Sequence, residues 1–147
     1  MKKILLPIDG SPRSLRTIQV VKQTFSPDDT ELTILLVIAS KAHLTPPPED
    51  PEPSAQEEIT ETVDPQAEEE SRLLLASFAR MLPGYHVDIA LRHGNPGPEI
   101  VRFAKEGTFD SILMTRSSRG PMQKLGSVAT YIVRNASFIT TTVLQEA

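Results

Sequence analysis

The sequence has no cysteine, which excludes disulfide bonds, thiolate metal sites and a cysteine nucleophile. It also has no long apolar run. The N-terminal "MKKILLPIDG" begins like a signal peptide, but its apolar run ends after three residues at Pro7. No later run reaches the roughly 18 apolar residues of a membrane span. We therefore expect a cytoplasmic protein of one domain, residues 1–147, with no membrane partner.

The short motifs of common catalytic sites are also missing. H-E-x-x-H, G-x-S-x-G and GxxxxGK[ST] do not occur. The histidines, His43, His86 and His93, have no carboxylate or second histidine at ligand spacing, so we expect no metal site. Basic residues are dispersed outside 116–124 and aromatics are few, which argues against a nucleic-acid partner. We expect no enzyme, although slow ATP hydrolysis stays open.

Charge is distributed unevenly along the chain. Ten acidic residues and no basic one lie between Glu49 and Glu70, which leaves 9 acidic and 15 basic residues elsewhere. Six of the 13 prolines fall between Pro46 and Pro65. This composition predicts a mobile insertion at about 42–65, either disordered or a functional lid. The rest of the chain has an excess of basic residues and could bind anions. For the acidic segment itself, a solvated acidic surface is the alternative explanation.

Outside that segment, apolar patterns alternate between strand and helix. Leu15, Ile18, Val21 and Phe25 recur at helical spacing after "DGSPRS", where Ser11 is the candidate N-cap and Pro12 the first helical residue. A second helix, Gln66 to Leu82, has Leu74, Leu75, Phe78, Met81 and Leu82 as its buried stripe. Two further helices are expected within 94–107 and 127–136. The strands are expected at 2–8, 31–39, 85–91, 109–115 and 137–145.

This order predicts an α/β fold, a five-stranded parallel-type sheet with helices on both faces. In such Rossmann-like sheets, ligands bind beyond the carboxyl ends of the strands. Three polar loops follow strand ends, at 9–11, 39–41 and 115–120, and should converge. Lys41 could face the same pocket. The sequence therefore predicts a site at this edge.

Three segments resemble the universal stress protein family, and together they span nearly the whole chain. They are "ILLPIDGSPRS", "RHGNPGPEIVRFAKEGTFDSILM" and "LGSVATYIVRNAS". The resemblance implies the universal stress protein fold and, in members that bind ATP, the pattern Gly-x2-Gly-x9-Gly-Ser/Thr after the fourth strand. Glycines there let the backbone approach phosphates, and the following helix N-terminus binds them.

This sequence departs from that pattern. It keeps Gly126 and Ser127, but Thr115 and Ser118 stand where the first two glycines are expected, and seven residues separate Ser118 from Gly126 instead of nine. If position 115 needs a positive φ, a β-branched threonine is a poor occupant. Arg116, Arg119 and Lys124 bring positive charge that could bind phosphate in place of glycine. A plain surface loop that only caps the helix is the alternative.

The resemblance implies an adenine nucleotide as ligand, ATP or an AMP-like molecule, with Mg²⁺ as an accompanying ion. It places the nucleotide near the following residues: Pro7, Ile8, Asp9, Val37, Met114, Thr115, Ser117, Ser118, Gly126, Ser127 and Val128. Asp9 would receive the adenine or ribose. From the residues alone, Asp9 could equally cap the first helix or form an Asx-turn.

The resulting hypothesis is a cytoplasmic regulator that binds a nucleotide without efficient catalysis and acts through a protein partner. The alternative is a dimeric interaction module of the same family that binds no nucleotide. In the family the last strand pairs across a two-fold axis, so a homodimer through Phe138 to Leu144 is expected in either case. A third possibility is that the acidic segment folds over the basic loop as an internal phosphate mimic.

Overall fold

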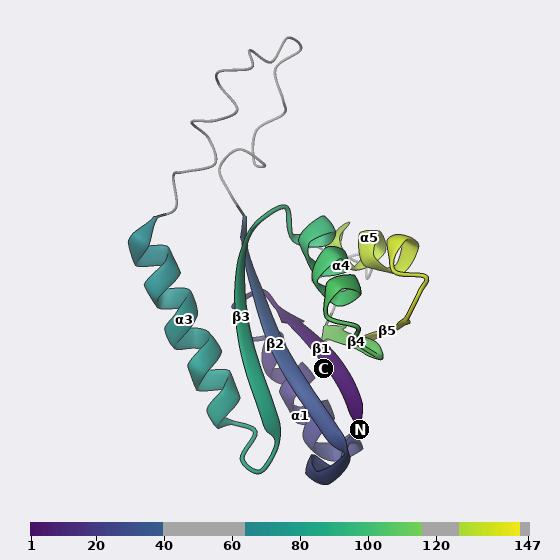
Figure 1. Ribbon diagram of the computed structural model, residues 1–147. Coiled ribbons are helices and arrows are strands. Elements are labelled where there is room, and N and C mark those ends of the chain that lie inside the picture. The colour runs from purple at the N-terminus through teal and green to yellow at the C-terminus, as the bar shows by residue number, and fades with distance from the viewer. Residues whose placement is uncertain (40–63, 116–126, 145–147) are drawn as a thin grey trace.

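The computed structural model describes residues 1–39, 64–115 and 127–144. In this part, five parallel strands form one sheet in the order β3-β2-β1-β4-β5 (Figure 1). The strands are β1 Lys2–Ile8, β2 Thr30–Ala39, β3 His86–Gly94, β4 Ser111–Thr115 and β5 Thr140–Leu144. The helices are α1 Ser14–Thr24, the short 3₁₀ helix η1 Pro27–Asp29, α3 Pro65–Arg80, α4 Pro96–Glu106 and α5 Ser127–Asn135. The predicted fold class is confirmed.

The sheet separates two hydrophobic cores. On one face, Ile18 and Val21 of α1 and Phe78 of α3 pack against alternate residues of the inner strands. On the other face, Ile100 of α4 and Ile132 of α5 pack against the intervening strand residues. Figure 1 shows α1 and α3 on one side of the sheet and α4 and α5 on the other. Because both faces are covered, the central strands β1 and β2 carry continuous apolar runs, Ile4–Ile8 and Ile34–Ala39, as in other parallel sheets.

The first helix starts later than the sequence predicted. α1 begins at Ser14, and its N-cap position is Arg13, which makes no capping hydrogen bond through its side chain. Ser11 and Pro12 lie in the preceding turn, where the carbonyl of Ser11 accepts the N–H of Ser14 at 3.1 Å. The prediction of Ser11 as N-cap is therefore wrong, because Asp9 organises a separate turn ahead of the helix.

Two residues expected in the core are exposed. Leu15 and Met81 have 39% exposure each. The buried side of α1 runs instead through Ser14, Thr17, Ile18 and Val21, so Leu15 lies outside it. Met81 is the C-cap of α3, where the helix ends, and the next residue, Leu82, takes the buried position instead.

Strand ends also differ from the sequence pattern. β3 continues past Leu91 to Gly94, because its pairing with β2 runs as far as Ala39. β5 begins at Thr140, so Phe138 precedes the strand and is 45% exposed. The predicted insertion at about 42–65 lies outside the described residues except for its last two, Asp64 and Pro65, which begin α3. None of the helices in the described ranges is long and apolar enough to cross a membrane.

Candidate functional site

A cavity lies where β1 and β4 separate. β1 pairs with β2 along all of Lys2–Ile8, but with β4 only at Ile4 and Leu5. Farther along β1, Pro7 has no N–H to donate to a neighbouring strand. The order of strands reverses between β1 and β4, and the space beyond the strand ends at such a point is where ligands bind in open α/β sheets.

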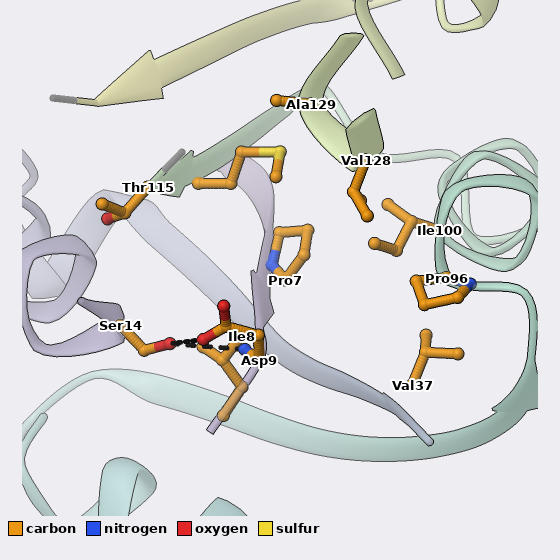
Figure 2. Close-up of a pocket in the computed structure, with 11 residues that line it drawn as sticks. Pro7, Ile8, Asp9, Ser14, Val37, Pro96, Ile100, Thr115, Val128 and Ala129 are labelled. Atoms are coloured by element: carbon orange, nitrogen blue, oxygen red, sulfur yellow. Dashed lines mark hydrogen bonds between the residues drawn. The ribbon is translucent and has the colours of Figure 1, made fainter. Parts of the chain in front are cut away.

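The cavity has a volume of about 140 Å³. It is lined by Pro7, Ile8, Asp9, Ser14, Val37, Pro96, Ile100, Met114, Thr115, Val128 and Ala129. In Figure 2, the apolar side chains of Val37, Ile100 and Val128 lie on one side of this space, and Asp9 and Ser14 lie on the other. A space of about 150 Å³ with apolar walls holds one aromatic ring the size of benzene. The described part of the site therefore fits a flat heterocycle with a polar edge.

The polar side of the cavity is a turn built on Asp9. Its Oδ1 accepts the N–H of Ser11 at 2.9 Å, the hydroxyl of Ser11 at 2.6 Å and the hydroxyl of Ser14 at 3.2 Å. The N–H of Asp9 also donates to Ser14 Oγ at 3.3 Å. Oδ2 has one charged neighbour in the described part of the chain, Arg13 Nη2 at 4.0 Å. The structure thus shows the Asx-turn, which holds the carboxylate at the cavity.

Burial on its own would raise the pKa of Asp9. The hydrogen bonds from the hydroxyl and N–H of Ser11, the hydroxyl of Ser14 and the charge of Arg13 together outweigh it and hold the pKa of Asp9 below its ordinary value of 3.8. Asp9 is therefore a carboxylate at neutral pH. It can accept hydrogen bonds from a ligand, but its low pKa makes it a weak base.

Thr115 occupies the end of β4 without backbone strain. Among the described residues other than glycine, positive φ occurs at Thr108 alone. Thr115 keeps its strand conformation, and its hydroxyl lies 2.7 Å from the hydroxyl of Thr17 on α1. Position 115 therefore does not need a positive φ, and the β-branched threonine there fits without strain.

The structure brings together seven of the sequence-predicted residues. Pro7, Ile8, Asp9, Val37, Met114, Thr115 and Val128 line the cavity. Ser127 is the first residue of α5, next to the cavity wall but exposed. The remaining predicted residues, Arg116, Ser117, Ser118, Arg119, Lys124 and Gly126, lie outside the described residues, as does Lys41.

Sequence reasoning missed four lining residues: Ser14, Pro96, Ile100 and Ala129. The loop after β3 also ends at this edge, which topology could have indicated for Pro96. Ile100 follows one helical turn later. The close approach of α4 and α5 sets this wall, because a Cβ added at Gly97 would lie only 2.9 Å from Cδ1 of Tyr131. No group of three or more metal-ligating side chains occurs among the residues described.

The fold and the cavity define a Rossmann-like α/β protein with a ligand-sized space at the switch point of its sheet. The chain belongs to the universal stress protein family, whose model matches residues 1–143. No curated protein matches the chain.

Solved structures share this fold. The hypothetical protein MJ0577 has a TM-score of 0.71 at 22% identity, with 99% of this chain and 96% of that chain covered. A universal stress protein in complex with cAMP has a TM-score of 0.68 at 16% identity, with 99% and 98% covered. A family member from Arabidopsis thaliana with AMP bound has a TM-score of 0.66 at 15% identity, with 100% and 93% covered.

Proposed function

We propose that this protein is a cytoplasmic regulator that binds an adenine nucleotide at the switch-point cavity and transmits the bound state to a protein partner. The observation that carries this proposal is a pre-organised carboxylate, Asp9, at the polar side of an otherwise mostly apolar space of about 140 Å³. Solved relatives hold cAMP and AMP.

The base would occupy the apolar part of the cavity. Val37, Ile100 and Val128 come from β2, α4 and α5, so three elements enclose one flat group. Adenine presents apolar faces and a polar edge, which suits such a space with few polar groups. Asp9 Oδ2 would accept a hydrogen bond from the ribose hydroxyls or the exocyclic amine.

The phosphates would lie toward the N-terminus of α5. This nine-residue helix begins at Ser127, and its next two residues line the cavity. The free N–H groups and the positive end of the dipole at a helix start favour phosphate there. Arg116, Arg119 and Lys124 remain proposed sources of positive charge, with Mg²⁺ as an accompanying ion.

We propose binding without efficient turnover. Hydrolysis of ATP needs a base that positions and activates water. Within the described part of the cavity lining, Asp9 is the one ionisable side chain, and its lowered pKa makes it a poor proton acceptor. Any ATPase activity should be slow.

The test is isothermal titration calorimetry with AMP, cAMP and magnesium-ATP at low salt, on the unmodified protein and on Asp9→Asn. Asparagine keeps the size of the side chain but removes its charge. We expect roughly 10- to 100-fold weaker binding, because a hydrogen bond to a charged group contributes about 1.5–3 kcal/mol. Asp28→Asn is the matched control, since Asp28 is an exposed residue of η1 and does not line the cavity.

Absence of heat with all three nucleotides at millimolar concentration would reject the proposal. The alternative function would then apply, a dimeric interaction module that binds no nucleotide and pairs through Phe138 to Leu144. The observation in its favour is the hydrogen bond between Thr17 and Thr115, which already satisfies the hydroxyl of Thr115 at the cavity rim.

A further inference from the structure

β3 is an edge strand with a long free side. It pairs with β2 over its whole length, from Glu31 opposite His86 to Ala39 opposite Gly94. No strand in the described part of the chain pairs with its outer side. Figure 1 shows β3 in the foreground, with α3 on one side and α4 on the other. Among the described residues, the outward backbone groups of β3 therefore have no strand partner, although the carbonyl of Leu91 accepts the guanidinium of Arg92 at 3.0 Å.

The sequence of β3 carries few of the features that protect a free edge. Proteins block free edges with charged side chains, above all lysine, and with proline, bulges or short strands. β3 contains no lysine and no proline, is nine residues long, and keeps an unbroken register with β2. The opposite edge strand, β5, has five residues. Ile89, next to the middle of β3, is 46% exposed, so the edge is partly apolar as well.

The two charged residues of β3 are placed symmetrically about Ala90. Asp88 and Arg92 are both exposed and, at alternate positions of the strand, lie on the face that α4 covers. The guanidinium carbon of Arg92 lies 4.9 Å from the ring centroid of Phe103 on α4, which holds the charge on that face. Opposite charges at equal distances from one residue are complementary to a second copy turned through a two-fold axis.

We propose that the β3 edges of two copies pair antiparallel about a two-fold axis at Ala90. Asp88 then lies opposite Arg92 of the partner subunit, and the same pair recurs on the other side of the axis. Directly opposed residues in antiparallel strands have Cβ atoms about 4.5–5.5 Å apart, close enough for an ion pair. The two sheets become one continuous sheet with an isologous interface.

The charges select this register over its neighbours. The pairing about Ala90 is also the one in which His86 meets Gly94, so all nine residues overlap. A shift of two residues leaves Asp88 opposite an uncharged residue. A shift of four places either Asp88 or Arg92 opposite its own copy, and like charges in direct opposition destabilise a strand pair.

This surface lies at the opposite edge of the sheet from β5, so pairing through β5 does not exclude it. It shares no residue with the lining of the nucleotide cavity. The proposal therefore stands or falls independently of ligand binding.

The first test uses charge reversal. Asp88→Arg and Arg92→Asp each place like charges opposite one another, whereas the double variant restores opposite charges with the positions exchanged. In sedimentation equilibrium over a concentration series, we expect each single variant to weaken self-association by about tenfold or more. We expect the double variant to recover most of that loss. Equal behaviour of all four proteins, or a double variant as weak as the singles, would overturn the proposal.

The second test is a disulfide at the axis. Ala90→Cys introduces one cysteine into a chain that has none, so a covalent dimer can form only through position 90. Opposed Cα atoms about 4.5–5.5 Å apart in an antiparallel pair fall within the range that a disulfide spans. We expect mild oxidation to link Ala90→Cys much faster than the exposed control Thr24→Cys, and Asp88→Arg to slow it. Equal rates at positions 90 and 24 would count decisively against the interface.

Discussion

Thr17 Oγ1 on α1 and Thr115 Oγ1 at the end of β4 lie 2.7 Å apart and share a hydrogen bond. Thr17 is fully buried, so this bond satisfies its hydroxyl inside the protein. The bond joins α1 to the strand end that forms the rim of the cavity. A glycine at 115, as the family pattern has there, would leave Thr17 without this partner.

Replacement of Thr17 by valine should lower the free energy of unfolding by about 1–2 kcal/mol, because Thr115 loses its partner while the shape of the buried side chain is kept. Urea unfolding followed by circular dichroism measures this change. Thr24→Val, at the exposed end of the same helix, should change stability by less than about 0.5 kcal/mol. Equal effects at both positions would show that the hydrogen bond contributes nothing specific.

The titration of Asp9 should depend on Ser11. Ser11 donates both its hydroxyl and its N–H to Asp9 Oδ1, and these bonds help to hold the pKa of Asp9 below 3.8. In Ser11→Ala the hydroxyl is lost, so the pKa of Asp9 should rise. Carboxyl carbon chemical shifts in an NMR pH titration report the change directly. A pKa that stays the same in Ser11→Ala would mean that the hydroxyl is not a significant cause.

The lowered pKa of Asp9 also predicts how the stability of the protein varies with pH. The pKa of Asp9 is lower in the folded protein than the ordinary 3.8 of an unfolded chain. Its contribution to stability is therefore fully present above the unfolded pKa and is lost as the pH falls through the folded pKa. The difference in unfolding free energy between the unmodified protein and Asp9→Asn should be constant from pH 7 to about pH 5 and should change only in more acidic solution. A difference that changes mainly between pH 5 and pH 7 would contradict this account.

A larger side chain in the cavity should remove ligand binding without unfolding the protein. Val37→Phe places a ring in the space of about 140 Å³, so a nucleotide base should bind at least about tenfold more weakly. Stability should stay within about 1 kcal/mol, because the ring fills an existing space instead of displacing packed atoms. Calorimetry and thermal unfolding measure the two quantities. Val133→Phe is the control, since Val133 is 49% exposed on α5 and does not line the cavity.

The effect of Gly97→Ala on stability should change sign when Tyr131 is also replaced, because the two residues are in contact. A Cβ at position 97 would lie 2.9 Å from Cδ1 and 3.2 Å from Cβ of Tyr131, so the ring of Tyr131 or α5 itself must shift to accept it. Gly97→Ala should destabilise the protein by about 1–3 kcal/mol. In a Tyr131→Gly background all three contacts are absent, and the same substitution should stabilise by up to about 1 kcal/mol, because alanine is the better helix former. Destabilisation in both backgrounds would assign the effect to something other than this contact.

The order of elements was predictable because strand and helix periods alternate along the chain. The apolar run of β1 and the helical spacing of Ile18 and Val21 each identify their element from local sequence. Boundaries were less predictable. α1 begins three residues after Ser11 because Asp9 Oδ1 accepts both the N–H and the hydroxyl of Ser11 and so holds it in a separate turn ahead of the helix.

The site was partly predictable for a related reason. Pro7, Asp9 and Thr115 follow from the rule that strand ends meet at one edge of a parallel sheet. Ile100 and Ala129 were not predictable, because they lie within helices whose approach to the sheet depends on packing between α4 and α5. Likewise, nothing local indicates that Thr17 and Thr115, 98 positions apart, share a hydrogen bond.

The sequence by itself determined the class of fold, the family and the composition of the edge at which a ligand would bind, because these follow from short-range periodicity and short motifs. Tertiary structure alone decided the size of the cavity, the partner of Thr115 and the exposure of β3 with Asp88 and Arg92 on one face. The physical reason is that the cavity volume, the hydrogen-bond partners and the exposure of an edge strand depend on which elements distant in the sequence pack together. Side-chain packing then sets the distances between those elements to within a fraction of an ångström.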